Sequence, residues 1–364
     1  MIGAFSTLFR YIIRQFLTSF TVVMLILLGV MLLFETVELL RRVSDMPGVS
    51  FRLVLSMAFL KLPYLGVRVL PMGILFSAIH TCWKLNKTSE LVVIRSSGIS
   101  AWQFLSPLLI CAALIGVFST MVLSPASAIF LSKQEQMERV HFLNDASLIT
   151  VSRTGIWLRQ PSDAGYALIH SESFDKKEWQ MNGVTILFFD AADNFIRRVD
   201  SPVAYLKDGY WDIRQPVMNG RGGQQRAEMQ KLPTELTAQK IEESFADPET
   251  ISFWSTPEYI HIMEETGFPA TRLHLHFHAL LAQPFLFIAM VLLAATFSLR
   301  PPRHGGVVYM IALGVVTGFF VFFMESILHA FGISQKIPVY LAAWSPALIA
   351  TLLGGTALLH MEDG

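Results

Sequence analysis

Three histidines at alternate positions, His274, His276 and His278, are the side chains of this sequence that most resemble metal ligands. On a helix, His274 and His278 would share a face one turn apart, whereas on a strand all three would share it. A structural zinc site usually has four ligands, and no cysteine lies nearby to complete one. We therefore predict interfacial histidines and no metal site, and keep a membrane-bound metalloenzyme as an alternative.

Sequence motifs for catalysis or nucleotide binding are absent. The chain contains no G-x-x-x-x-G-K-[ST] phosphate loop, no H-E-x-x-H and no G-x-S-x-G. We therefore predict no catalytic residue and no cofactor bound by this chain; any ATP and Mg would be bound by a partner. The 28 basic and 28 acidic residues cancel, so no global basic field indicates nucleic acid.

A charged cluster follows the first apolar run, with Glu35 and Glu38 ahead of Arg41 and Arg42. Glu38 lies three and four residues before the arginines, so helical pairing would contribute about 0.2–0.5 kcal/mol per pair. Alternatively, the arginines contact an anionic lipid headgroup, because a guanidinium binds phosphate through two parallel hydrogen bonds. The residues alone leave both interpretations open.

Other charged and aromatic side chains in the apolar segments can be explained by structural roles alone. Lys61 and Arg68, seven residues apart, would face the same way on a helix and could pair with Glu35 or Glu38. Glu325 is expected to be an interfacial carboxylate. The apolar faces of the first and fifth spans, which include Phe319, Phe320, Phe322 and Phe323, are more often bundle core or lipid contacts than a ligand site.

A short polar stretch at 85–100, LNKTSELVVIRSSGIS, contains four consecutive aliphatic residues. Thr88 or Ser89 can cap a helix, Glu90 suits its first turn, and Gly98 can end it. Because each residue advances about 100°, the four aliphatics cover most of the circumference of this helix of about nine residues. They predict either a helix packed into its own bundle or a docking helix for a cytoplasmic partner.

Six apolar segments are long enough to span a bilayer core, which takes about 20 helical residues. They lie near 16–40, 57–83, 101–131, 275–299, 306–329 and 338–360. Three spans therefore precede a polar domain and three follow it, which places both termini on one side. Short-loop lysines and arginines favour cytoplasmic termini.

The polar region alternates apolar and polar residues at period two, which is typical of strands with one buried face. Examples are GIWLRQ, GYALIHSESF, GVTILFF and PVAYLKDGYWDIRQ, the last with a hairpin at Asp208-Gly209 of expected type I′. Short strands at close spacing predict an antiparallel sandwich or jelly roll. A helix is expected in TPEYIHIMEETG, with Pro257 in its first turn and Gly267 at its end.

The order of these elements resembles the LptF/LptG (YjgP/YjgQ) family of lipopolysaccharide export permeases. The resemblance is carried by three segments, SELVVIRSSGIS, TGIWLRQ and ISFWSTPEYIHIMEETGFPATRLHLHFHALLAQPF. It is closer to the LptG branch than to the LptF branch. It implies an α+β membrane protein with six transmembrane helices and an inserted periplasmic β jelly-roll domain. The implied division is 1–134, with a coupling helix at about 86–98, then 135–265, then 266–364.

The resemblance also implies a function and partners. Family members pair as an LptF–LptG heterodimer on an LptB-type ATPase dimer, extract lipopolysaccharide from the inner membrane and pass it to LptC-type and LptA-type periplasmic proteins. By this resemblance, the residues that couple to the ATPase are Ser89, Glu90, Leu91, Val92, Ile94 and Arg95. Those expected to bind lipid are Arg41, Arg42, Phe34, Phe319, Phe320 and Phe323.

One position departs from the family pattern. LptG relatives can carry a basic residue about where this chain has Glu35, so we expect Glu35 to pair with a cation instead of contacting phosphate. The paralogous LptF-type subunit, or a permease for another amphiphile, is the remaining alternative.

Overall fold

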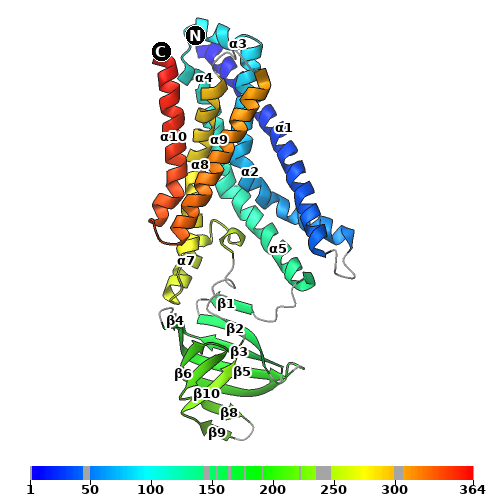
Figure 1. The fold of residues 1–364 in the computed structure, drawn as a ribbon, viewed down its shortest axis with the longest axis vertical. Helices are drawn as coiled ribbons and strands as arrows, with labels where there is room; N and C mark the ends of the chain where they lie inside the picture. Colours follow the sequence, from blue (N-terminus) through cyan, green and yellow to red (C-terminus); the bar gives the residue numbers. More distant parts are fainter. Residues whose placement is uncertain are drawn as a thin grey trace. The chain divides into compact units, whose positions relative to one another are not determined.

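The computed structural model describes residues 2–43, 50–142, 148–152, 155–162, 165–175, 178–190, 192–220, 223–234, 247–298 and 306–363. The chain divides into two compact units, one helical and one built on a sheet (Figure 1). The helical unit comprises Met1–Met137, Glu249–Trp254 and His274–Gly364, and the sheet unit comprises Glu138–Pro248 and Ser255–Leu273.

Six helical segments of the described chain are long and apolar enough to cross a membrane, as predicted. The third segment is composite, because α4 (Ala101–Phe118) continues through the π-helix η1 (Ser119–Leu123) into α5 (Ser124–Phe142). The other five are α1 (Ile2–Val43), α2 (Phe51–Lys87), α8 (Thr271–Ser298), α9 (Gly306–Ile333) and α10 (Val339–Asp363).

Helix α2 contains two prolines, Pro63 and Pro71, at which the sequence predicts a kink or a break. The helix is not broken at either one and runs continuously over 37 residues. Its first turn is capped by the Ser50 hydroxyl, which accepts a hydrogen bond from the Leu53 amide at 3.3 Å. Surrounding helices therefore maintain a helix that its sequence alone interrupts.

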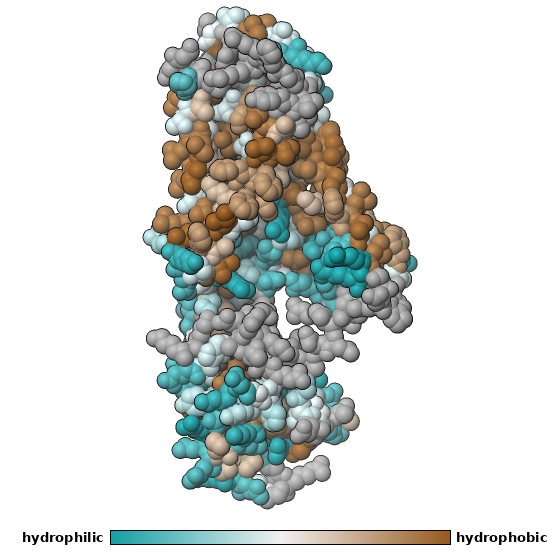
Figure 2. Space-filling view, in the orientation of Figure 1, coloured by the Kyte–Doolittle hydropathy of each residue, from teal (hydrophilic) through white to brown (hydrophobic). Residues whose placement is uncertain are grey.

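The core of the helical unit lies where α2, α4 and α8 meet, and it includes Ile74, Leu105, Leu108, Phe287 and Met290. Outside this core the helices carry many exposed apolar side chains. Figure 2 shows hydrophobic residues gathered over the helical unit and hydrophilic residues over much of the sheet unit. Exposed apolar surface of this extent marks a protein that lies in lipid or against partners.

The sheet unit contains one ten-stranded sheet in which every neighbouring pair of strands is antiparallel. The main order is β1-β2-β3-β5-β6-β7-β10, with β4 on β5, and β8 between β6 and β9. The strands are β1 (Leu148–Ser152), β2 (Gly155–Ser162), β3 (Gly165–Ser171), β4 (Ser173–Asp175), β5 (Gln180–Asp190), β6 (Phe195–Lys207), β7 (Tyr210–Arg214), β8 (Val217–Gly220), β9 (Gly223–Arg226) and β10 (Met229–Pro233).

The predicted alternation of strand residues is confirmed by burial. Ile156 and Leu158 of β2, and Val184 and Ile186 of β5, are each at most 1% exposed. The hairpin between β6 and β7 is also confirmed, because Lys207 pairs with Tyr210 across Asp208-Gly209. Of these two turn residues only Gly209 has a positive φ, 82°, so the turn is not the type I′ expected.

Two short helices lie among the described residues between β10 and α8. α7 (Thr256–Glu265) has Pro257 in its first turn and is followed by Gly267 at a φ of 86°, as predicted. An added Cβ at Gly267 would also meet the Phe174 carbonyl, so this position needs glycine for both conformation and space. The 3-10 helix η2 (Pro248–Thr250) precedes α7 in the chain, and its Glu249 belongs to the helical unit.

The contact between the third and fourth spans compensates for a proline. Pro284 in α8 has no amide hydrogen, so the carbonyl of Leu280, four residues earlier, lacks its helical donor. The buried Thr120 hydroxyl in η1 donates to that carbonyl at 2.9 Å. Gly116 permits this approach, because a Cβ there would lie 2.5 Å from the Cα of Pro284.

We expect Thr120→Val to lower the free energy of unfolding by about 1–3 kcal/mol, the cost of leaving a buried carbonyl without a donor. Thr120→Ser keeps the hydroxyl and is the matched control. Thermal unfolding of both variants in detergent measures the difference. Equal destabilisation by Val and Ser would show that the hydroxyl contributes nothing and that only packing is lost.

Candidate functional site

The short helix α3 (Glu90–Ser96) has one buried face and one exposed face. Leu91 and Ile94 are 3% and 7% exposed and belong to the core of the helical unit. Val92 and Val93 are 62% and 66% exposed. A seven-residue helix is too short to be stable alone, so its buried face fixes it on the bundle. Its other face leaves two adjacent valines uncovered in this chain.

The residues before α3 hold its first turn in place. Ser89 adopts a φ of 60°, which turns the chain sharply between α2 and α3. The Thr88 hydroxyl donates to Glu90 Oε1 at 2.9 Å, and the Glu90 side chain also lies close to the Tyr11 hydroxyl of α1. The Glu90 carboxylate is therefore tied to both neighbouring helices. It has a fixed position where the sequence alone suggests only a helix-initiating acid.

Some details of α3 differ from the sequence-based expectation. The helix has seven residues and not about nine, because 86 and 87 belong to α2 and Thr88 caps the end of α2. Val93, not named among the expected coupling residues, is the most exposed aliphatic of the four. The three-residue spacing of Leu91 and Ile94 is the signal that puts Val93 on the opposite face. The side chain of Arg95 lies outside the described residues.

The end of α1 contains the charged cluster, with the helical pairing that its spacing allows. Arg41 Nη2 lies 3.1 Å from Glu38 Oε2, and Arg42 Nε lies 3.2 Å from Glu38 Oε1. The arginine side chains remain 77% and 52% exposed. Exposed ion pairs of this kind contribute little to stability. Both arginine side chains therefore keep more than half of their surface exposed while they contact Glu38.

Glu35 pairs with a cation, as expected from its departure from the family pattern. Lys61 Nζ of α2 donates to Glu35 Oε1 at 2.8 Å, and the two side chains are 25% and 13% exposed. This ion pair joins α1 to α2 one to two turns before the arginines. Arg68, the other cation on α2, does not join it and instead donates to the Tyr64 hydroxyl at 3.4 Å.

The aromatic side chains expected to contact lipid are exposed on α1 and α9. Phe34 is 71% exposed, and Phe319, Phe320 and Phe323 are between 55% and 62% exposed. Phe319 and Phe323 stack with ring centroids 6.2 Å apart, one turn from each other. None of the four belongs to the buried core of the bundle, so their apolar surface is available to lipid or to another protein.

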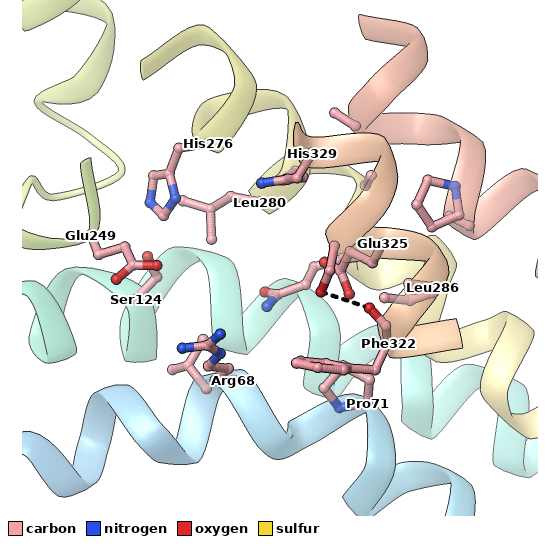
Figure 3. Close-up of a pocket in the computed structure, with 18 of the residues that line it drawn as sticks. Arg68, Pro71, Ser124, Glu249, His276, Leu280, Leu286, Phe322, Glu325 and His329 are labelled. Carbon is pink, nitrogen blue, oxygen red and sulfur yellow. Dashed lines mark hydrogen bonds between the residues drawn. The ribbon is translucent and has the colours of Figure 1, made fainter. Parts of the chain in front are cut away.

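A pocket of about 310 Å³ lies within the helical unit and collects polar groups from several elements. Figure 3 shows Arg68 of α2, Glu249 of η2, His276 of α8, and Glu325 and His329 of α9 around it. Tyr64, Gln283, Ser124, Ser127 and Ser326 also line it. Ionisable side chains inside a membrane bundle are costly and commonly mark functional positions.

Sequence reasoning did not find this pocket. It treated Glu325 as an interfacial carboxylate and Arg68 as a possible partner of Glu35 or Glu38. The detectable signal was the spacing of Glu325 and His329, which lie one turn apart in an otherwise apolar span and so share a face. Glu249 could not have been assigned, because it reaches the pocket from η2, far from the other lining residues in the chain.

The three histidines lie on a helix, so they divide between faces. His276 lines the pocket, whereas His274 and His278 lie one turn apart on α8 and are not among its lining residues. Within the described ranges, no group of three or more His, Cys, Asp or Glu side chains is placed to hold a metal ion.

Comparisons with known proteins extend over nearly the whole chain. The family model described as "Lipopolysaccharide export system permease LptF/LptG" matches residues 10–360. A protein of Haemophilus influenzae named "Lipopolysaccharide export system permease protein LptG" is 24% identical over 98% of this chain and 99% of its own length. A protein of Escherichia coli strain K12 with the same name is 23% identical, over 94% of this chain and 95% of its own length.

Proposed function

Because the chain belongs to the LptF/LptG family of lipopolysaccharide export system permeases and is most like LptG, we propose that it moves lipopolysaccharide by coupling to a partner ATPase. It is an inner-membrane permease subunit, and its family membership implies a second LptF/LptG-type permease as partner. An LptB-type ATPase dimer binds ATP and Mg and supplies the energy of hydrolysis.

The exposed face of α3 is the observation that carries this proposal. Val92 and Val93 are uncovered in this chain, while Leu91 and Ile94 anchor the same helix on the bundle. A helix with one anchored face and one free apolar face can fit a groove of another protein. Movement of a bound ATPase would then act directly on α2 and α1 through the contacts of Thr88 and Glu90.

The sheet unit lies in the periplasm in this proposal and receives the lipid. Its antiparallel sheet has strands that end its pairing order, and an edge strand can accept a strand of another protein. An LptC-type and then an LptA-type protein would join there and form the bridge that takes lipopolysaccharide away. The exposed aromatics of α1 and α9 line the lipid path towards that unit.

A pull-down of the full-length chain from native membranes tests the proposed assembly. We expect an ATPase of the LptB type and a second family permease to co-purify, with lipopolysaccharide identified by mass spectrometry of the bound lipid. Recovery of the chain without any ATPase, after crosslinking in the membrane, would contradict the coupling role. If another amphiphile co-purifies in place of lipopolysaccharide, the proposed cargo is wrong, but the proposed coupling to the ATPase is unaffected.

Neutralising Arg41 and Arg42 together by glutamine should lower photo-crosslinking of lipopolysaccharide by about tenfold. Each exposed guanidinium is placed to form charge-assisted hydrogen bonds with a phosphate, worth about 1.5–3 kcal/mol when fully formed. Crosslinking from a probe at Phe34 measures the effect. The matched control is Arg52→Gln, which removes a cation from the start of α2. Undiminished crosslinking in the double variant would favour pairing with Glu38 as the whole role of the arginines.

A further inference from the structure

The pocket of the helical unit contains charged side chains that do not form ion pairs with one another. Arg68 forms no ion pair with Glu249 or Glu325 in the part of the chain that the structure describes. Its polar contact is the Tyr64 hydroxyl at 3.4 Å, and Glu249 lies close to the same hydroxyl. Charges in a membrane bundle are costly unless opposite charges meet them. The pocket therefore suits a ligand that supplies charges of its own.

The sign of these charges restricts the ligand. With neutral histidines, the lining carries one positive group, Arg68, and two negative groups, Glu249 and Glu325. A phosphate group alone would meet two carboxylates, and an ammonium alone would leave the guanidinium without a counterion. A molecule with one phosphate and one ammonium group satisfies both signs.

A buried imidazole offers a further polar contact. His329 Nε2 is inaccessible and has no hydrogen-bond partner among the described residues. In Figure 3 the His329 ring lies at the pocket, on the same side as His276 and above Arg68. An unsatisfied buried polar atom costs free energy, so a ligand group in this space would remove that penalty.

The surroundings of the pocket favour a lipid over a soluble ligand. Arg68 and Phe322 are exposed at its edge, with the guanidinium 6.0 Å from the Phe322 ring centroid. Phe319 and Phe323 continue this exposed apolar surface along α9. A volume of about 310 Å³ admits a small headgroup but not the large sugar headgroup of lipopolysaccharide.

We propose that this pocket binds the headgroup of a zwitterionic phospholipid of the phosphatidylethanolamine class. The phosphate lies against Arg68 and Tyr64, the ammonium lies between Glu325 and Glu249, and the acyl chains leave past Phe322. The bound lipid is not the exported cargo, so the site is a lipid-binding function additional to export. It joins α2, α8, α9 and α10 through one bound molecule.

Native mass spectrometry of the full-length protein in detergent tests this site without ATP or cargo. Phosphatidylethanolamine and phosphatidylglycerol are compared because both have the phosphate and the acyl chains, but only the first has an ammonium group. We expect the wild type to bind phosphatidylethanolamine about tenfold more tightly, as for one charge-assisted contact. Glu325→Gln should reduce that preference to less than about threefold, and Arg68→Gln should weaken both lipids by about tenfold.

The controls separate binding from folding. Arg52→Gln removes an exposed cation from the same helix and should bind both lipids as the wild type does. Ser326→Phe narrows the exposed edge of the pocket, removes no charge and should weaken the binding of both lipids, as Arg68→Gln does; it replaces Arg68→Gln if that variant does not fold. Equal wild-type affinity for the two lipids would overturn the proposal. So would an unchanged preference in Glu325→Gln, because in either case the Glu325 carboxylate does not select the ammonium group.

Discussion

Replacing Val92 and Val93 together by aspartate should lower co-purification of the partner ATPase by more than about tenfold. Burying one valine side chain contributes about 1.5–3 kcal/mol, and an unpaired carboxylate in an apolar groove adds a desolvation cost. The two valines are already exposed in this chain, so the substitutions remove no contact from its own core. The loss of association should therefore occur in a permease that still folds.

Affinity purification from solubilised membranes, with quantification of the ATPase, measures this loss. Met229→Asp is a suitable control for an added aspartate, because Met229 is an apolar side chain 53% exposed on β10 of the sheet unit. Leu91→Asp provides the opposite reference: Leu91 is 3% exposed, so that change should destabilise the bundle itself. If a folded double-aspartate variant retains the ATPase fully, Val92 and Val93 do not form the docking face.

Reversing the charge of Glu35 should destabilise the protein by about 1–3 kcal/mol. Glu35→Lys places two cations where Lys61 Nζ now lies 2.8 Å from a carboxylate oxygen. Removing one partner of a fully buried ion pair lowers the stability of a protein by about 3–5 kcal/mol. Side-chain exposures of 13% and 25% put this pair between the buried and the surface cases, so the expected loss is smaller.

The exchange variant Glu35→Lys with Lys61→Glu distinguishes pairing from position. If the ion pair stabilises the contact of α1 with α2, the double variant should regain most of the stability that each single reversal loses. Thermal unfolding in detergent measures all three variants. If the double variant loses as much unfolding free energy as the two single variants lose together, the two charges act independently.

The six apolar spans and the sheet were predictable because they follow from local residue patterns. Long apolar runs define the spans, and the period-two alternation in GIWLRQ and GVTILFF defines β2 and β5. Pro257 and Gly267 set the limits of α7. Even the ion pair of Glu35 could be expected, because a lone carboxylate in an apolar helix needs a cation.

The pocket and the junction at Pro284 could not be predicted, because they depend on residues far apart in the sequence. Thr120 satisfies a carbonyl 160 positions away, and no pattern near either residue indicates the other. Arg68 and Glu325 likewise come together only after α2 and α9 pack. Likewise, the two prolines of α2 signal an interruption that neighbouring helices override.

Helix α1 also has the geometry of a lever. It is one uninterrupted helix of 42 residues, with Tyr11 close to Glu90 near one end and Arg41 near the other. At about 1.5 Å of rise per residue, roughly 45 Å separate these two positions. A tilt of about five degrees at the Tyr11 end therefore displaces the arginines by about 4 Å, nearly the pitch of one helical turn. The length of α1 alone converts a small rotation beside α3 into a displacement comparable to the size of a phosphate group.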